Sequence, residues 1–83
     1  MIKDIKQYIL NKNEICLDLE TTGLNPWLNK ILLISLGNES QQFCIDVRNT
    51  NKNDIIELLI LLKNKLIIGH NTKFDYKFLY YNY

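Results

Sequence analysis

Apolar and polar residues alternate strictly along E-I-C-L-D-L-E, residues 14–20. A period of two is typical of a β-strand that buries one face. Ile15, Leu17 and Leu19 would then face the core, and the residues between them would project from the opposite face, namely Cys16, Asp18 and Glu20.

Two more strands are expected next along the chain. Residues 30–36, K-I-L-L-I-S-L, form a nearly continuous apolar run, which favours a strand covered on both faces. The segment G-N-E-S, residues 37–40, is typical of a hairpin connection into a third strand, Q-F-C-I-D-V, residues 42–47. Because short loops join these three strands, we expect them to be antiparallel neighbours.

Apolar residues at helical spacing predict two helices. Ile2, Ile5 and Ile9 recur at that spacing and indicate a short amphipathic helix over residues 2–10. Residues 53–64 would form the other helix, which follows the third strand. Because this segment is apolar nearly all round, we expect the helix to be largely buried.

The remaining segments predict a short strand and a last helix. L-I-I-G, residues 66–69, suits a buried strand, and residues 71–81 suit a helix with Asn71 as its N-cap. A helical crossover before the fourth strand would make that strand parallel to its neighbour. The pattern therefore predicts an α/β fold, in which a mixed sheet has three antiparallel strands, a parallel strand and at least one covered face.

Composition limits the class of protein. The chain has 83 residues, of which 47% are hydrophobic, as expected of one small domain with its own core. A net charge of +1 gives no strong basic footprint and excludes neither nucleic acid nor acidic partners. The N-terminus lacks the pattern of a signal peptide, and the apolar region 55–68 is shorter than the roughly 20 residues of a membrane span. We therefore expect a soluble, cytoplasmic protein that does not bind membranes.

The two cysteines, Cys16 and Cys44, lie in apolar strand-like contexts and lack the spacing of a metal site. They are interpreted as buried thiols in a reducing compartment, with a disulfide as the weaker alternative.

Asp18 and Glu20 are the candidate chemical groups of the first strand. Residues i and i+2 project from the same strand face about 7 Å apart, so two ionised carboxylates would repel each other there. Exposure to solvent is the plainer way to offset this repulsion, and a basic partner or a bound cation are the others. Asp75 would join the pair if the fourth strand lies beside the first. Three carboxylates facing one another are hard oxygen ligands that suit Mg²⁺ or Mn²⁺, and two such ions can drive phosphodiester cleavage.

Two motifs resemble the first two motifs of the four-acid (DEDD) 3′–5′ exonuclease superfamily, which has a ribonuclease-H-like fold. They are D-L-E-T-T-G-L-N-P at residues 18–26 and G-H-N-T-K-F-D-Y-K-F-L at residues 69–79. Together they are most similar to the proofreading exonuclease domain of family-A DNA polymerases. The resemblance implies two-metal hydrolysis at the 3′ end of single-stranded DNA. An RNA-directed exonuclease of the same superfamily is an open alternative.

The resemblance also implies a role for each matched residue. The catalytic and metal-binding positions are Asp18, Glu20 and Asp75, and Glu20 would also contact the terminal 3′ hydroxyl. The nucleotide-binding positions are Thr21, Thr22, Leu24, Asn71 and Phe74, with Leu24 wedged against the terminal base. Core packing is the alternative for Leu24 and Phe74, and an ordinary turn is the alternative for the two threonines.

Trp27 and His70 lie beside these motifs. Trp27 is most simply a residue that packs within its loop, and stacking on a base is the alternative. His70 is interpreted as a structural residue at a strand end, because a two-metal scheme generates hydroxide without a histidine base.

The superfamily pattern includes a fourth carboxylate on a later helix, and this sequence has no Asp or Glu after Asp75. We therefore expect residues 1–83 to be a single partial 3′–5′ exonuclease-like domain, incomplete at its C-terminus, whose partner would be the rest of a polymerase or exonuclease chain. A catalytically inactive relic or subunit that binds metal, single-stranded nucleic acid or a partner protein is the alternative. An open sheet edge would favour self-association.

Overall fold

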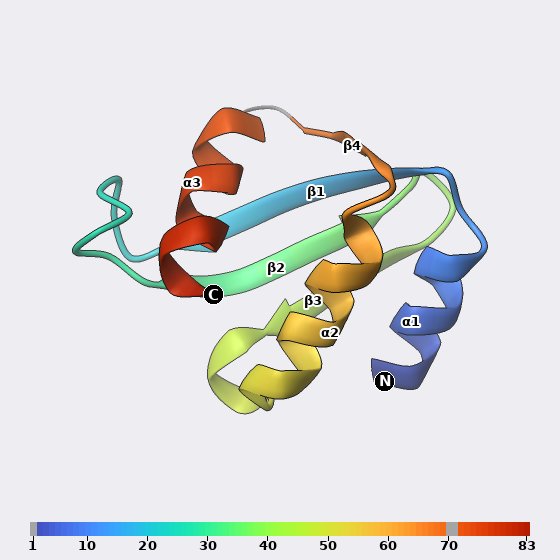
Figure 1. Cartoon of the computed structure of the whole chain (residues 1–83), viewed down its shortest axis with the longest axis horizontal. Coiled ribbons are helices and arrows are strands. Elements are labelled where there is room, and N and C mark those ends of the chain that lie inside the picture. The colour runs from blue at the N-terminus through green and yellow to red at the C-terminus, as the bar shows by residue number, and fades with distance from the viewer. Residues whose placement is uncertain (1, 70–71) are drawn as a thin grey trace.

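A computed structural model describes residues 2–69 and 72–83 and confirms the predicted order of helices and strands (Figure 1). The elements are α1 (Ile2–Leu10), β1 (Glu14–Thr21), β2 (Ile31–Gly37), β3 (Gln42–Asp46), a short 3-10 turn (Val47–Asn49), α2 (Lys52–Leu62), β4 (Leu66–Ile68) and α3 (Thr72–Asn82). In this part of the chain, no helix is both long and apolar enough to cross a membrane.

The four strands form one mixed sheet in the order β3-β2-β1-β4. β1 is antiparallel to β2 and parallel to β4, and β2 is antiparallel to β3. The prediction of three antiparallel strands and one parallel crossover strand is therefore confirmed. β1 lies in the interior of the sheet, next to the strand that leads into α3.

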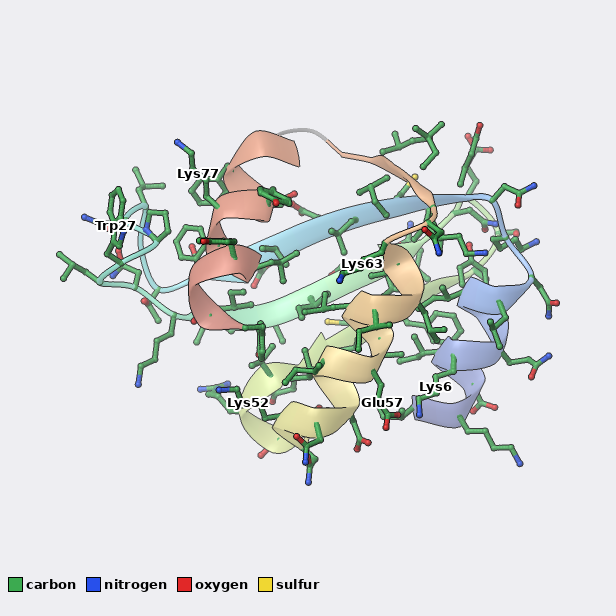
Figure 2. All side chains as sticks on the ribbon, in the orientation of Figure 1. Lys6, Trp27, Lys52, Glu57, Lys63 and Lys77 are labelled. Carbon is green, nitrogen blue, oxygen red and sulfur yellow. The ribbon has the colours of Figure 1, made fainter. Side chains whose placement is uncertain are left out.

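The core lies between the helices and one face of the sheet. Ile15, Leu17 and Leu19 of β1 are buried in one cluster with residues of all three helices, as their alternation predicts. The fully buried Phe78 is the residue of α3 in this cluster. Figure 1 shows the helices gathered on this one side, and Lys6 of α1 forms an ion pair with Glu57 of α2 (Figure 2).

The other face of the sheet is open, which corrects two expectations. Leu33 and Ser35 of β2 stay half-buried on that face, so the prediction that β2 is covered on both sides was wrong. Cys16 and Cys44 are exposed free thiols, so the prediction that both thiols are buried was wrong, and they form no disulfide. The helices pack on the opposite face of the sheet, so the apolar run of β2 predicted more burial than the fold provides.

α2 is also less buried than its composition suggests. Ile55, Leu58 and Leu62 are buried, whereas Ile60 is exposed over 56% of its surface. The helix begins after Asn51, whose side chain accepts a hydrogen bond from the N–H of residue 53. Because the sheet meets only one side of this helix, the expectation of a largely buried helix was wrong.

The hairpin between β2 and β3 depends on Gly37. Its φ of 150° lies in a region that side chains rarely adopt, and a Cβ there would lie 2.2 Å from the carbonyl oxygen of Gln41. The Asn38 N–H donates to that same oxygen at 2.8 Å, and the Asn38 side chain accepts hydrogen bonds from Ser40 and Gln41. The tight closure of this turn therefore requires glycine.

Candidate functional site

Two carboxylates project from the open face of β1. Asp18 and Glu20 are exposed, and their Cα positions lie opposite Ser35 and Leu33 of β2. A shallow cleft of about 570 Å³ runs over this face beside Asp18; its walls come from Cys16, Leu17, Asp18, Ser35, Leu36, Gly37, Gln42, Ile68 and Gly69. The cleft reaches Ile68 and Gly69 at the end of β4.

Asp75 belongs to α3, and its environment is unusual for an acid. It is only 3% exposed, and its Oδ2 atom accepts no hydrogen bond. Among the residues whose burial is described, it is the only buried charged side chain. Burial raises the pKa of Asp75, and the negative charge of Asp18 raises it further. Both effects disfavour the ionised form.

Asp75 lies on the helix-covered side of the sheet. It lines a groove of about 670 Å³ between α2 and α3, whose apolar walls include Leu17, Leu62 and Ile67. The structure therefore brings Asp18 and Asp75 close enough to interact electrostatically. It does not gather three or more Asp, Glu, His or Cys side chains close enough to hold a metal ion, as judged over residues 2–69 and 72–83. The assignment of the three carboxylates as metal ligands stays a prediction.

The two threonines after Glu20 hold the loop that follows β1. The Thr21 hydroxyl donates to the carbonyl oxygen of Gly23 at 2.6 Å. Thr22 closes the base of the loop, because its N–H donates to the Lys30 carbonyl and its hydroxyl accepts from the Lys30 N–H. The turn role considered from the sequence is therefore present, and nucleotide contact by these residues stays a prediction.

Two asparagines, which the sequence reasoning missed, hold the middle of this loop. The Asn25 side chain accepts from the Trp27 N–H at 2.9 Å, and the Asn29 side chain accepts from the Asn25 N–H at 3.0 Å. The Asn29 side chain also fills the space where a Cβ of Gly23 would lie, 2.6 Å from its Oδ1 atom. The sequence signal was the pair of asparagines four residues apart around Pro26 and Trp27.

The loop directs its large apolar side chains outward. Leu24 is 85% exposed, so the interpretation of this residue as core was wrong, and Trp27 and Leu28 are also exposed. Phe74 is half-buried beside Phe78, with their ring centroids 4.7 Å apart and tilted by 56°. The roles assigned to His70 and Asn71 fall outside the described residues.

Comparison with known proteins places this arrangement in a family. All 83 residues match the family model described as 3′–5′ exonuclease. The chain is 39% identical over 70 residues to DNA polymerase I of Aquifex aeolicus (strain VF5), a match that covers 84% of this chain and 11% of the polymerase. The chain thus spans about a tenth of the length of that relative.

A solved structure shares the fold. The catalytic core of RRP6 from Trypanosoma brucei matches 100% of this chain and 24% of its own length, with a TM-score of 0.74 and 21% identity. At that identity the likeness concerns the fold alone, and it supports the ribonuclease-H-like architecture expected from the two motifs. With the family match over its whole length and the motifs at residues 18–26 and 69–79, the chain belongs to the 3′–5′ exonucleases of the DEDD type, in the branch of the family-A DNA polymerase proofreading domains.

Proposed function

We propose that residues 1–83 carry part of a metal-dependent exonuclease domain that hydrolyses phosphodiester bonds at the 3′ end of single-stranded DNA during proofreading. The single observation that carries this proposal is the buried carboxyl group of Asp75, whose Oδ2 atom has no hydrogen-bond partner and which feels the charge of Asp18. The likeness to a DNA polymerase I favours DNA over RNA and favours the rest of a polymerase chain as the partner.

The donor chemistry fits a divalent cation. An isolated ionised carboxylate in a buried position carries a large desolvation cost unless it is paired or coordinates a metal. Asp18, Glu20 and Asp75 offer only oxygen donors, which Mg²⁺ and Mn²⁺ prefer. These three side chains would hold the ions. Once bound, the ions would supply positive charge at the attacking and leaving oxygens of the phosphodiester.

The chain's own residues have separate tasks in this proposal. Glu20, exposed on the open face, accepts a hydrogen bond from the terminal 3′ hydroxyl. Leu24, held outward by the loop, contacts the terminal base, and Thr21 and Thr22 keep the loop closed beneath it. Phe74, in the first turn of α3, and Asn71 are proposed to contact the terminal nucleotides.

A nuclease assay tests the proposal directly. A 5′-labelled single-stranded oligodeoxynucleotide should shorten from its 3′ end with Mg²⁺ or Mn²⁺ and stay intact in EDTA. Asp18→Asn should abolish the shortening. Glu14→Gln is the matched control, because it removes an exposed carboxylate from the other end of the same strand. Hydrolysis that continues in EDTA, or in the Asp18→Asn variant, would overturn the proposal, and an oligoribonucleotide in parallel separates RNA from DNA as substrate.

A second candidate function is a catalytically inactive subunit that binds metal or single-stranded nucleic acid. One observation favours it: the part of the chain that is described contains no group of three metal-ligating side chains. Calorimetric titration with Mg²⁺ and Mn²⁺ distinguishes the candidates, since binding without hydrolysis supports this one. If neither metal nor oligonucleotide binds, both candidates fail.

A further inference from the structure

The loop between β1 and β2, residues 22–30, exposes three large apolar side chains. Leu24 is 85% exposed, Trp27 69% and Leu28 80%, which is more than most apolar residues of this chain. Trp27 lies at one end of the molecule, away from α1 (Figure 2). We call Leu24, Trp27 and Leu28 the apolar tip; of these three, only Leu24 has a role in the function proposed above.

Hydrogen bonds within the loop hold the tip in its outward position. The Leu28 and Asn29 N–H groups both donate to the Asn25 carbonyl oxygen, at 3.1 and 2.8 Å. The Trp27 N–H donates to the Asn25 side chain. The polar backbone is therefore satisfied inside the loop while the apolar side chains face solvent. Because these hydrogen bonds already hold the loop in one conformation, the loop would lose little further conformational entropy when a ligand binds the tip.

The loop that carries the tip is flanked in sequence by Glu20 and Lys30. The loop starts directly after Glu20 and Thr21, at the end of β1 that carries the exposed carboxylates. Lys30 at its base is exposed, and Lys77 of α3 projects at the same end of the molecule (Figure 2). A single nucleic-acid strand alternates flat bases with phosphates, and this end of the molecule carries an aromatic ring, two leucines and exposed lysines.

We propose that Trp27, flanked by Leu24 and Leu28, stacks on an unpaired base of the single-stranded substrate and so positions the strand for the carboxylates of β1. The inference rests on the proposed function and adds a positioning residue to it. Stacking requires an unpaired base with a free face, and every base has such a face. Trp27 therefore favours single strands over duplex and reads little sequence.

Trp27 is the only tryptophan of the chain, so its fluorescence reports on this position alone. Binding of an oligothymidylate, followed by anisotropy of a label on the strand in EDTA, should quench the Trp27 emission over the same concentration range. An abasic strand of equal length keeps the phosphates and lacks the bases. It should bind more weakly and leave the emission unchanged.

Variants separate stacking from general apolar contact. Trp27→Ala should weaken oligothymidylate binding about tenfold, within the range of one lost base–aromatic stack, and leave abasic-strand binding unchanged. Trp27→Phe should retain most of the affinity, and Trp27→Leu should lose as much as Trp27→Ala. Leu10→Ala, which removes an exposed apolar side chain from α1, is the control and should bind as the unmodified chain does.

Each other outcome counts against the inference. Oligothymidylate binding without a change in Trp27 emission overturns stacking and leaves the proposed exonuclease function standing. Equal losses for the oligothymidylate and the abasic strand show that Trp27 acts on the backbone or on the fold. Loss of self-association in Trp27→Ala, with nucleic-acid binding unchanged, assigns the tip to a protein interface. If no strand binds at all, stacking is overturned, and the nuclease assay with Asp18→Asn decides separately on the proposed function.

Discussion

Asp75 is buried against the sheet with an unpartnered Oδ2 atom, and burial, reinforced by the carboxylate of Asp18, raises its pKa. The two residues come from sequence segments 57 positions apart, which the parallel pairing of β1 with β4 brings together. An acid in this position weakens the fold unless something else compensates it. The relationship therefore yields a prediction about stability that is independent of any nuclease assay.

Replacement of Asp75 by Asn should stabilise the metal-free chain at neutral pH. Because its pKa is raised in the folded state, the folded chain holds this proton more tightly than the unfolded chain does, and stability falls as pH rises from the ordinary to the raised pKa. Asp75→Asn should be more stable by about 1–3 kcal/mol above that window, because the amide carries no negative charge to desolvate. Urea unfolding in EDTA across a pH series measures the difference.

The same series contains its own control. Below the ordinary Asp pKa, Asp75 is protonated in both states, so the difference between the variant and the unmodified chain should disappear. Addition of Mg²⁺ at neutral pH should stabilise the unmodified chain and leave Asp75→Asn unchanged. A variant that is less stable at every pH would show that Asp75 makes a favourable contact as an anion.

Gly23 and Asn29 should behave as a coupled pair. A Cβ on Gly23 would displace the Asn29 side chain and break its hydrogen bond to the Asn25 N–H. Gly23→Ala and Asn29→Ala should each cost up to about 1 kcal/mol of stability, the value of one hydrogen bond, and each should alter the Trp27 emission. The double variant should cost little more than either single one, which a double-mutant cycle from urea unfolding measures. Additive losses would contradict the coupling.

Gly37→Ala should be more damaging than Gly23→Ala. A side chain at a φ of 150° is strained, and its Cβ would meet the backbone oxygen of Gln41 rather than a side chain that can rotate. We expect a loss of about 1–3 kcal/mol from backbone strain, and more from the contact. Thermal unfolding of the two alanine variants side by side tests the ranking, and equal melting temperatures would refute it.

Both cysteines should react in the folded protein. Cys16 and Cys44 are exposed on the open sheet face, so an aromatic disulfide reagent should modify two thiols per chain without denaturant. Cys16→Ser and Cys44→Ser should each remove one equivalent. A thiol that reacts only after urea is added would show that the open face is covered in solution.

The isolated chain should self-associate through β4. This strand lies at the edge of the sheet in the described part of the chain, with Leu66 60% and Ile68 44% exposed. Unpaired edge groups beside apolar side chains favour pairing with another chain. Sedimentation velocity should show mass that increases with concentration, and Leu66→Lys should shift the distribution towards monomer. A single monomeric species at high concentration would contradict this prediction.

The strand faces and the strand pairing could be predicted from the sequence, because they follow from local periodicity and from the rules of sheet topology. The alternation along β1 separated Ile15, Leu17 and Leu19 from Asp18 and Glu20, because a strand has only two faces. β4 does pair with β1, which was the condition for Asp75 to meet Asp18 and Glu20, and the meeting of the three acids stays a prediction. The motifs then indicated the family, which the comparisons confirm.

Properties that depend on non-local packing could not be predicted. The apolar run of β2 gave no signal that its second face stays open, since burial there depends on which elements cover the sheet. For the same reason the thiols of Cys16 and Cys44 were expected inside. The depth of Asp75 and the packing of Asn29 beneath Gly23 arise from contacts between segments, which residue patterns do not encode.

The parallel pairing of β1 and β4 has a consequence for the order of folding. The β1–β2–β3 hairpins bring together residues close in sequence, whereas Glu14 must meet Leu66 across a loop that contains two strands and a helix. Contacts of larger sequence separation carry a larger entropy of loop closure and form later. We therefore expect Asp18 and Glu20 to be placed early in folding and Asp75 to join them only when α2 and β4 have docked. The repulsion between Asp75 and Asp18 would then act late in folding.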